Sequence, residues 1–285
     1  MRIKSMHHAT PFCQWVSTSE NYDPSIIHHT IDSFDTQSLS TTHPLFPFLV
    51  YYGNQEDFRT FNRFATTVLE PDFYPDVVSC QSECYAYLSL GEVHPSRRYF
   101  QKLHQHGKLG FQHAYWESFM VPLTPLWQSI ILEEIIPSIV MGGYRGIMLD
   151  TVDSILYYNL ATKEQLIALI QEIKKKFPTL KIMLNRAFEL APLVPIDTML
   201  LESTLSGYDF EKESCFLYEE VIDRRYPKIP QYSIDYWPKS DLKGTLELYK
   251  RALSYGYRPV ITEISLRSLP VYTGWSPSLS IDHDG

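Results

Sequence analysis

Long apolar runs are absent from this sequence of 285 residues. The longest apolar stretch, residues 130–140, is interrupted by Glu133, Glu134 and Pro137, so the sequence predicts no membrane-spanning helix. The start at Met1 carries basic residues, but no apolar core follows them, so it does not resemble a secretory signal. Either the protein stays inside the cell or a leader lies outside this sequence, which leaves the localisation open.

Cysteine and positive charge are scarce as well. The spacings of the four cysteines fit no zinc-binding pattern, and the histidines of the N-terminal part lack carboxylate or cysteine partners at ligand spacing. We therefore expect inert thiols, no metal site and no cofactor. With 25 basic and 33 acidic residues the net charge is −8. Little in the chain can neutralise phosphates, which argues against a nucleic-acid partner.

Several catalytic fingerprints are also missing. The sequence has no Gly-x-Ser-x-Gly elbow, no His-Glu-x-x-His pair and no Gly-rich phosphate loop after a strand. These absences weaken the case for a serine hydrolase of that type, a metal-dependent hydrolase or deacetylase, and a nucleotide-binding enzyme.

Short apolar segments alternate with helical segments from about residue 46 onward. An apolar run such as Ile147 to Leu149 is typical of a strand buried on both faces, as in a parallel sheet. The strand candidates are 47–53, 65–70, 84–91, 146–150, 181–185, 197–202, 230–236 and 259–264. Eight strands alternating with helices predict an α/β fold, a single-domain (β/α)8 TIM barrel. An open, doubly wound sheet is the alternative.

Helix signals fill the gaps between these strands. Thr162 opens a capping box, and Pro178 follows the end of the helix that it begins. Ser240 is predicted to cap a second helix that closes near Gly256. A third helix is expected over residues 126–141, with a proline inside it.

The domain organisation follows from composition. A polar, irregular N-terminal extension is expected over residues 1–44, the barrel over 45–275 and a short tail over 276–285, in a monomeric protein. The connection over 93–125 contains Trp116 and Trp127, and such enlarged loops often shape a binding cleft.

Several of the predicted strands end in an acid or an amide. The carboxyl ends of barrel strands meet at one rim, where such folds place their chemistry. Asp150 and Glu202 each end an almost wholly apolar strand, and two facing carboxylates suit the cleavage of a glycosidic bond. We predict these two residues to be catalytic. Other residues at or near strand ends are predicted to bind substrate: Tyr51, Tyr52, Glu92, Asp153, Asn185, Tyr236 and Glu263.

A structural role is the alternative for the same residues. The acids can cap helix N-termini or pair with Arg145 and Arg186, and this alternative applies above all to Asp153. For Tyr236 and Glu263 the alternative is a buried rim residue that bonds to neighbouring backbone.

The sequence motifs at these strand ends together resemble those of glycoside hydrolase family 114, the endo-α-1,4-polygalactosaminidase-like or spherulin-4-like domains. The Pel polysaccharide hydrolase domain of family 166 shares them. The more specific motifs are AYLSLGE at residues 86–92 and GYRGIMLDTVDS at 143–154. Weaker matches lie at 50–53, 184–185, 200–202 and 256–262, so the resemblance runs from about residue 46 to 270.

The resemblance implies a (β/α)8 barrel that hydrolyses α-1,4-linked galactosamine polymers. It implies Asp150 and Glu202 as the catalytic pair, and it favours retention of configuration with Asp150 as nucleophile and Glu202 as acid/base. An acidic groove would suit a cationic, partly deacetylated polysaccharide. Family members are usually secreted. The alternative is a non-catalytic carbohydrate-binding or interaction protein on a degenerate barrel, which would be expected to have lost at least one rim acid.

Overall fold

The fold of the chain is seen in a computed structural model that describes residues 46–113, 115–219, 221 and 229–271. Its centre is a sheet of eight parallel strands in the order β1-β2-β3-β6-β7-β8-β11-β12. The strands are β1 (Phe46–Tyr51), β2 (Phe64–Leu69), β3 (Glu83–Ser89), β6 (Gly146–Asp150), β7 (Lys181–Asn185), β8 (Thr198–Glu202), β11 (Gln231–Tyr236) and β12 (Arg258–Thr262). All eight strand predictions are confirmed.

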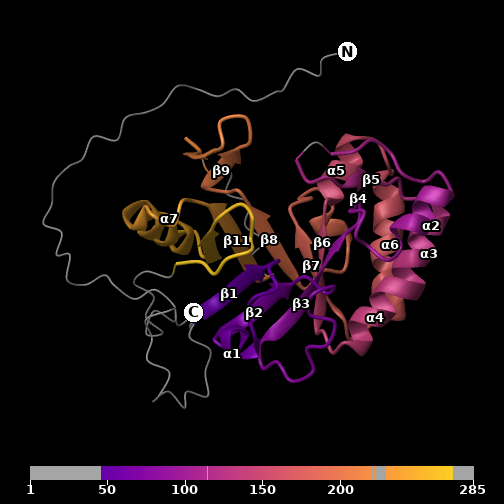
Figure 1. Cartoon of the computed structure of the whole chain (residues 1–285), viewed down its shortest axis with the longest axis horizontal. Coiled ribbons are helices and arrows are strands. Elements are labelled where there is room, and N and C mark those ends of the chain that lie inside the picture. The colour runs from indigo at the N-terminus through magenta and orange to yellow at the C-terminus, as the bar shows by residue number, and fades with distance from the viewer. Residues whose placement is uncertain (1–45, 114, 220, 222–228, 272–285) are drawn as a thin grey trace, which may run out of the picture.

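The sheet curls into a nearly closed barrel. Its first and last strands, β1 and β12, lie side by side without a backbone ladder between them. The segments that follow these strands are joined by a hydrogen bond of 2.7 Å from the Tyr52 amide to the Leu266 carbonyl. Figure 1 shows the strands at the centre of the molecule, with β1 below β8 and β11. The predicted TIM-barrel class is therefore confirmed.

The register of the strands aligns their carboxyl ends. Ser89 of β3 is opposite Asp150 of β6, and Ile234 of β11 is opposite Glu202 of β8. The four residues that precede Asp150 in β6, and the four that precede Glu202 in β8, are buried. Burial on both faces explains why these strands are continuous apolar runs rather than alternating ones. Their polar last residues meet at one rim.

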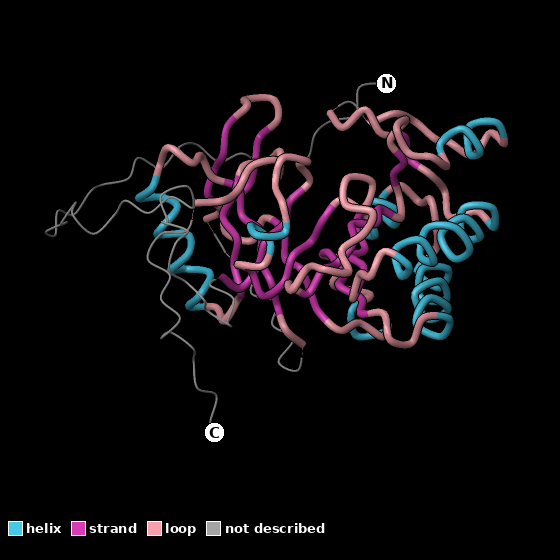
Figure 2. Tube along the Cα trace, turned by 60° about the horizontal axis from the view of Figure 1, so that its bottom comes forward, coloured by secondary structure: helices cyan, strands magenta, loops and turns pink. Residues whose placement is uncertain are grey.

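Two long helices flank opposite sides of the barrel (Figure 2). The helix α6 (Lys163–Lys176) begins with the predicted capping box, in which the Thr162 hydroxyl accepts from the Gln165 amide. The helix α7 (Leu242–Ser254) is capped by Asp241, whose carboxylate accepts from the Gly244 amide. Our prediction of Ser240 as this cap is one residue too early. Both residue types can cap a helix, and the chain turn selects the second of them.

The third predicted helix is interrupted. It consists of α3 (Pro125–Ile130), a π-helical turn η3 (Ile131–Ile135) and α4 (Ile136–Met141). Pro137 has no amide hydrogen, and in a regular helix its ring would clash with the carbonyl four residues earlier. The wider π turn ends two residues before this proline, so the axis continues while the α-helical hydrogen-bond pattern is broken.

The remaining elements are short and lie in the connections. They are α1 (Phe58–Phe61), α2 (Phe100–Gln105), α5 (Val152–Tyr157), η4 (Ala191–Leu193) and two antiparallel pairs, β4 (Glu92–Val93) with β5 (Phe119–Met120) and β9 (Ser206–Asp209) with β10 (Ser214–Leu217). The sequence did not predict the two antiparallel pairs. The expected extension over 1–44 and tail over 276–285 lie outside the described residues. No helix in the described part of the chain is long and apolar enough to cross a membrane.

Candidate active site

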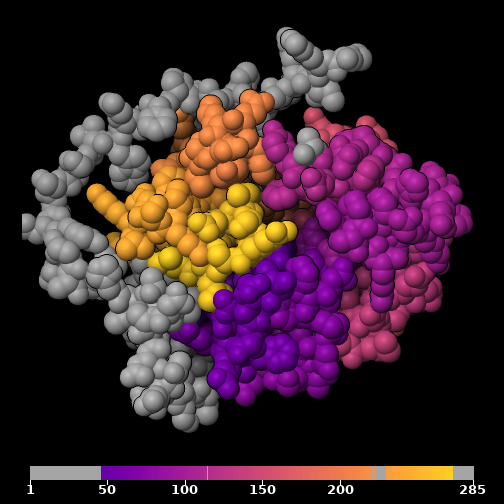
Figure 3. Space-filling view, in the orientation of Figure 1, coloured from indigo at the N-terminus to yellow at the C-terminus, as the bar shows by residue number. Residues whose placement is uncertain are grey.

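A cavity of about 560 Å³ opens at the carboxyl ends of the strands. In Figure 3 it is the hollow between the orange β9–β10 hairpin, the yellow segment after β12 and the magenta segment that contains β4 and β5. Seven of the nine predicted site residues line it: Tyr52, Glu92, Asp150, Asp153, Asn185, Glu202 and Tyr236. Strands far apart in the sequence therefore bring their polar ends to one cavity.

Asn185 connects the two predicted catalytic carboxylates. Its side-chain Nδ2 donates one hydrogen bond of 2.8 Å to Asp150 Oδ1 and another of 2.7 Å to Glu202 Oε2. The amide orientation follows from these partners, because the opposite orientation would set its oxygen against two carboxylates. Asn185 is 4% exposed. The three residues thus form one hydrogen-bonded unit across the ends of β6, β7 and β8.

The environment of Asp150 favours its protonated form. Burial and, after it, the negative charge of Glu202 raise the pKa of its carboxyl to about 7, against the hydrogen bond from Asn185, which lowers it. A group with this pKa gains or loses its proton near neutral pH. Two carboxyls this close cannot both ionise freely, so the pair retains one proton below about pH 7.

Glu202 has a second donor. The Tyr236 hydroxyl at the end of β11 hydrogen-bonds to Glu202 Oε1, on the other side of the carboxylate from Asn185. Burial and the charge of Glu202 raise the pKa of Tyr236 well above its usual value. The tyrosine therefore keeps its proton and orients Glu202. The sequence suggested that Tyr236 either binds substrate or bonds to neighbouring backbone. It lines the cavity, and its hydroxyl bonds to a side chain instead of the backbone.

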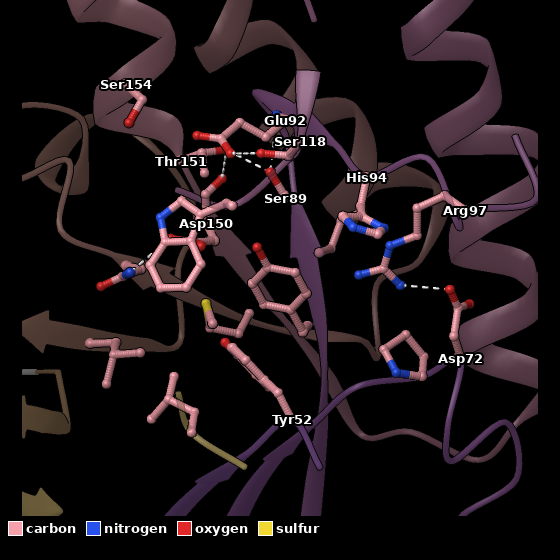
Figure 4. A pocket seen from close by; sticks show the side chains of 18 of the residues that line it. Tyr52, Asp72, Ser89, Glu92, His94, Arg97, Ser118, Asp150, Thr151 and Ser154 are labelled. Atoms are coloured by element: carbon pink, nitrogen blue, oxygen red, sulfur yellow. Dashed lines mark hydrogen bonds and ion pairs between the residues drawn. The ribbon is translucent and has the colours of Figure 1, made fainter. Parts of the chain in front are cut away.

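A hydroxyl network holds the Asp150 end of the cavity (Figure 4). Thr151 has a left-handed backbone with φ of 60°, which is strained for a β-branched residue. Its hydroxyl accepts from the Gly91 amide at 2.7 Å and lies 2.8 Å from the Ser89 hydroxyl. Ser118 donates to the Glu92 carboxylate, which fixes this third acid at the cavity wall. The hydrogen bonds of this strained residue thus join the end of β6 to the segment that carries Glu92.

Asp153 and Tyr52 also line the cavity. Asp153 forms an ion pair of 3.1 Å with Arg186, which is the structural role that the sequence offered as the alternative to substrate binding. Both residues nevertheless line the cavity. Tyr52 packs its ring against that of Tyr87 with 4.7 Å between centroids. The aromatic wall therefore has two rings, of which the sequence indicated one.

The structure corrects the predicted position of two residues. Tyr51 and Glu263 do not line the cavity. Successive strand residues point to opposite faces, so Tyr52 faces the cavity while Tyr51 is buried against Phe61 with 5.8 Å between ring centroids. Glu263 accepts a 2.8 Å hydrogen bond from Ser268 instead.

Other residues of the cavity were not predicted. Arg97 lines it, paired with both oxygens of Glu70. No sequence signal connects Arg97 to Glu70, because β3 lies between them. Of the two tryptophans noted in the long connection, Trp116 lines the cavity. Trp127 is fully buried and donates to the Leu90 carbonyl at 2.8 Å, so it belongs to the core.

Asp235 anchors the loop that follows Glu202. It is fully buried at the end of β11, and its Oδ1 accepts from the amides of Leu205 and Ser206 at 2.7 and 2.9 Å. Its Oδ2 accepts from the Thr204 hydroxyl at 3.0 Å. Burial raises the pKa of this carboxyl, and the accepted hydrogen bonds oppose that shift. The β9–β10 hairpin is therefore tied at its base to the strand that carries Tyr236.

Metal ligands are not gathered at this site. Among the residues that the structure describes, no group of three or more His, Cys, Asp or Glu side chains is arranged to hold a metal ion. The five histidines of the N-terminal extension lie outside the described residues.

One family model and several solved structures are similar to this chain. The sequence model of glycoside-hydrolase family GH114 matches residues 79–280. The solved glycoside hydrolase domain of PelA from Pseudomonas aeruginosa is similar with a TM-score of 0.65 and 23% identity, over 79% of this chain and 97% of that one. A variant of that domain gives a TM-score of 0.67 with the same identity and coverage.

A second solved structure has the same fold. Ega3 from Aspergillus fumigatus, in complex with galactosamine, is similar with a TM-score of 0.61 and 15% identity, over 82% of this chain and 98% of that one. The comparison with curated protein sequences gives no match.

Proposed function

We propose, from the premise that this chain belongs to glycoside-hydrolase family GH114, that it cleaves α-1,4-linked galactosamine-type polysaccharide by means of Asp150 and Glu202. The family establishes the enzyme as a glycoside hydrolase. The carboxylate pair, the stereochemistry and the sugar are our proposals, and the placement of both acids in one cavity supports them.

The observation that carries the mechanism is the amide between the two acids. Asp150 Oδ1 lies 2.8 Å and Glu202 Oε2 lies 2.7 Å from Asn185 Nδ2, so these oxygens are at most about 5.5 Å apart. Carboxyl groups about 5–5.5 Å apart are typical of retaining enzymes, whereas inverting enzymes need about 6.5–9.5 Å to admit a water. The spacing therefore supports retention.

In a retaining mechanism each acid acts twice. Asp150 attacks the anomeric carbon while Glu202 gives its proton to the leaving glycosidic oxygen, which forms a glycosyl ester on Asp150 and breaks the glycosidic bond. Glu202 then takes a proton from water, and the resulting hydroxide equivalent displaces Asp150. Two inversions at the same carbon retain the α configuration.

The raised pKa of Asp150 and the resemblance to family 114 assign the shared proton to different carboxyls. Asp150 is the acid whose pKa is raised to about 7, whereas the resemblance assigns the proton to Glu202. We propose the assignment of the resemblance, because one cause of the raised pKa is the charge of Glu202. Once Glu202 holds the shared proton, that charge is gone and Asp150 ionises more readily.

The sugar is proposed from the charge of the cavity. Asp72, Glu92 and Asp153 join the catalytic pair, so five carboxyls line the cavity, and three arginines balance them in part. A protonated amino sugar suits an acidic cavity, and the solved relative Ega3 was crystallised with galactosamine. The aromatic wall of Tyr52 and Tyr87 can pack against a sugar face.

Turnover of defined polymers tests this proposal. The enzyme should release reducing ends from partly deacetylated α-1,4-galactosamine polymer at least tenfold faster than from the fully N-acetylated polymer or from starch. Proton NMR of the first product should show the α anomer, and a chelator should leave the rate unchanged. A β first product would contradict retention. Loss of activity on chelation, restored by metal, would contradict the carboxylate mechanism.

Asn185 should set the pH dependence of this reaction. The pair needs one proton, so kcat/KM should fall about tenfold per pH unit above about pH 7. The hydrogen bond from Asn185 lowers the pKa of Asp150, so Asn185→Ala should move this alkaline limb to higher pH and reduce kcat about 100-fold.

The matched control is Thr262→Val, a buried strand-end residue at β12 whose hydroxyl has no hydrogen-bond partner in the described part of the chain. It should leave the limb in place. The substrate amine titrates in the same way for every variant, so it cannot account for a difference between them. An alkaline limb that does not move in Asn185→Ala would show that Asn185 does not set the pKa of the carboxyl pair.

A further inference from the structure

Four aromatic rings meet at the edge of the cavity, and they come from two separate loops. Tyr115 and Trp116 belong to the turn between β4 and β5, and Phe210 lies at the tip of the β9–β10 hairpin. Phe210 packs against Tyr115 with 4.7 Å between centroids and 31° between planes, and Trp116 meets it edge-on at 5.5 Å. Tyr208 contacts Phe210 from within the hairpin at 5.1 Å. We name these four residues the aromatic bridge.

The two loops are anchored beside the proposed catalytic residues. The hairpin begins at Ser206, a few residues after Glu202, and Asp235 holds its base through two backbone amides and a hydroxyl. The other loop is tied to the cavity wall by the contact between Ser118 and Glu92. In Figure 3 the orange hairpin and the magenta segment meet above the hollow. The aromatic bridge therefore has a defined position relative to the cavity.

Two of the four rings remain exposed although they pack against Phe210, while Tyr208 and Phe210 are half-buried. Tyr115 is 52% exposed and Trp116 is 45% exposed, and Trp116 also lines the cavity. Large aromatic side chains that pack only for stability are usually buried, as Trp127 is. A contiguous exposed apolar surface that continues from a pocket is typical of a binding site.

The charges around the bridge indicate what it binds. Glu117 follows Trp116, and Glu211 and Glu213 flank the tip of the hairpin; all three are exposed. The one lysine there, Lys212, is paired with Asp209 at 2.9 Å. Aromatic faces bordered by acids attract a cationic ligand with apolar faces, through stacking, cation–π contacts and long-range charge.

We propose that the aromatic bridge is a second carbohydrate-binding surface, which holds sugar units of the galactosamine-type polymer at a distance from the bond being cleaved. The inference rests on the proposed function for the identity of the polymer. Its consequence is a preference for long chains, because only a chain that extends from the cavity reaches the bridge.

The test compares a long substrate with a short one. For each variant we take the ratio of kcat/KM on long, partly deacetylated α-1,4-galactosamine polymer to kcat/KM on an aryl α-galactosaminide. Tyr115→Ala and Phe210→Ala should each lower this ratio about tenfold. Phe216→Ala is the matched control, since this ring is 39% exposed on the same hairpin, contacts Tyr218 and does not line the cavity. Thermal melting establishes that each variant is folded.

A binding measurement separates the inference from the proposed function. Calorimetry measures binding of the same polymer to the Asp150→Asn variant, which prevents turnover. Adding Tyr115→Ala or Phe210→Ala to this variant should weaken binding at least tenfold. If the enzyme does not cleave the polymer but the tyrosine still strengthens binding, the proposed function fails and the bridge stands as a binding surface. An unchanged ratio and unchanged affinity in both bridge variants would overturn the bridge, whatever the rate of cleavage.

Discussion

Asp150→Asn and Glu202→Gln should each lower kcat on the galactosamine polymer by about a thousandfold or more. Either change removes a group that forms a bond or moves a proton in the transition state, while its shape and most of its hydrogen bonds remain. Initial rates of reducing-end release measure the loss. Glu263→Gln is the matched control, because this acid also follows a barrel strand but does not line the cavity, and it should keep the wild-type rate within about threefold.

Azide tells the two acids apart. With an activated aryl α-galactosaminide, azide should restore activity to Asp150→Ala and give the β-glycosyl azide, because it attacks in place of the missing nucleophile. In Glu202→Ala azide should capture the glycosyl ester on Asp150 and give the α-glycosyl azide. The reversed pair of products would exchange the two roles. Wild-type rates in the Asn and Gln variants would leave a non-catalytic carbohydrate-binding protein as the better description.

Asp235→Leu should destabilise the fold by about 3–5 kcal/mol, because it leaves two backbone amides and a hydroxyl buried without their acceptor. For a domain of this size the melting temperature should fall by roughly 10 °C. Differential scanning calorimetry at pH 7 measures the change. The same substitution releases the base of the hairpin that carries Phe210.

Asp235→Asn is the matched variant. Its amide oxygen can still accept from Leu205 and Ser206, and its nitrogen can donate to the Thr204 hydroxyl, so the expected loss is below about 1 kcal/mol. The comparison separates hydrogen bonding from charge. Equal losses in the two variants would show that the buried charge, and not the acceptor, stabilises the loop.

The strands and their polar ends could be predicted from the sequence, because a strand that is buried on both faces has a recognisable local sequence pattern. A central strand of a parallel sheet is a short apolar run, and the residue that leaves the core at its end becomes polar, as Asp150 and Glu202 do. Once eight such runs alternate with helices, the right-handed connections of the fold bring their ends to one rim. Seven of the predicted residues therefore share one cavity.

Contacts between segments distant in the chain were decided only by the tertiary structure. That Asn185 bridges the two acids depends on the register of β7 against β6 and β8, and that Tyr52 rather than Tyr51 faces the cavity depends on a one-residue phase at the end of β1. The meeting of Tyr115 with Phe210 joins two loops with no common pattern. Local sequence records whether a residue is buried, because burial depends on its own solvation; it does not record its partner, because that is set by how the whole barrel closes.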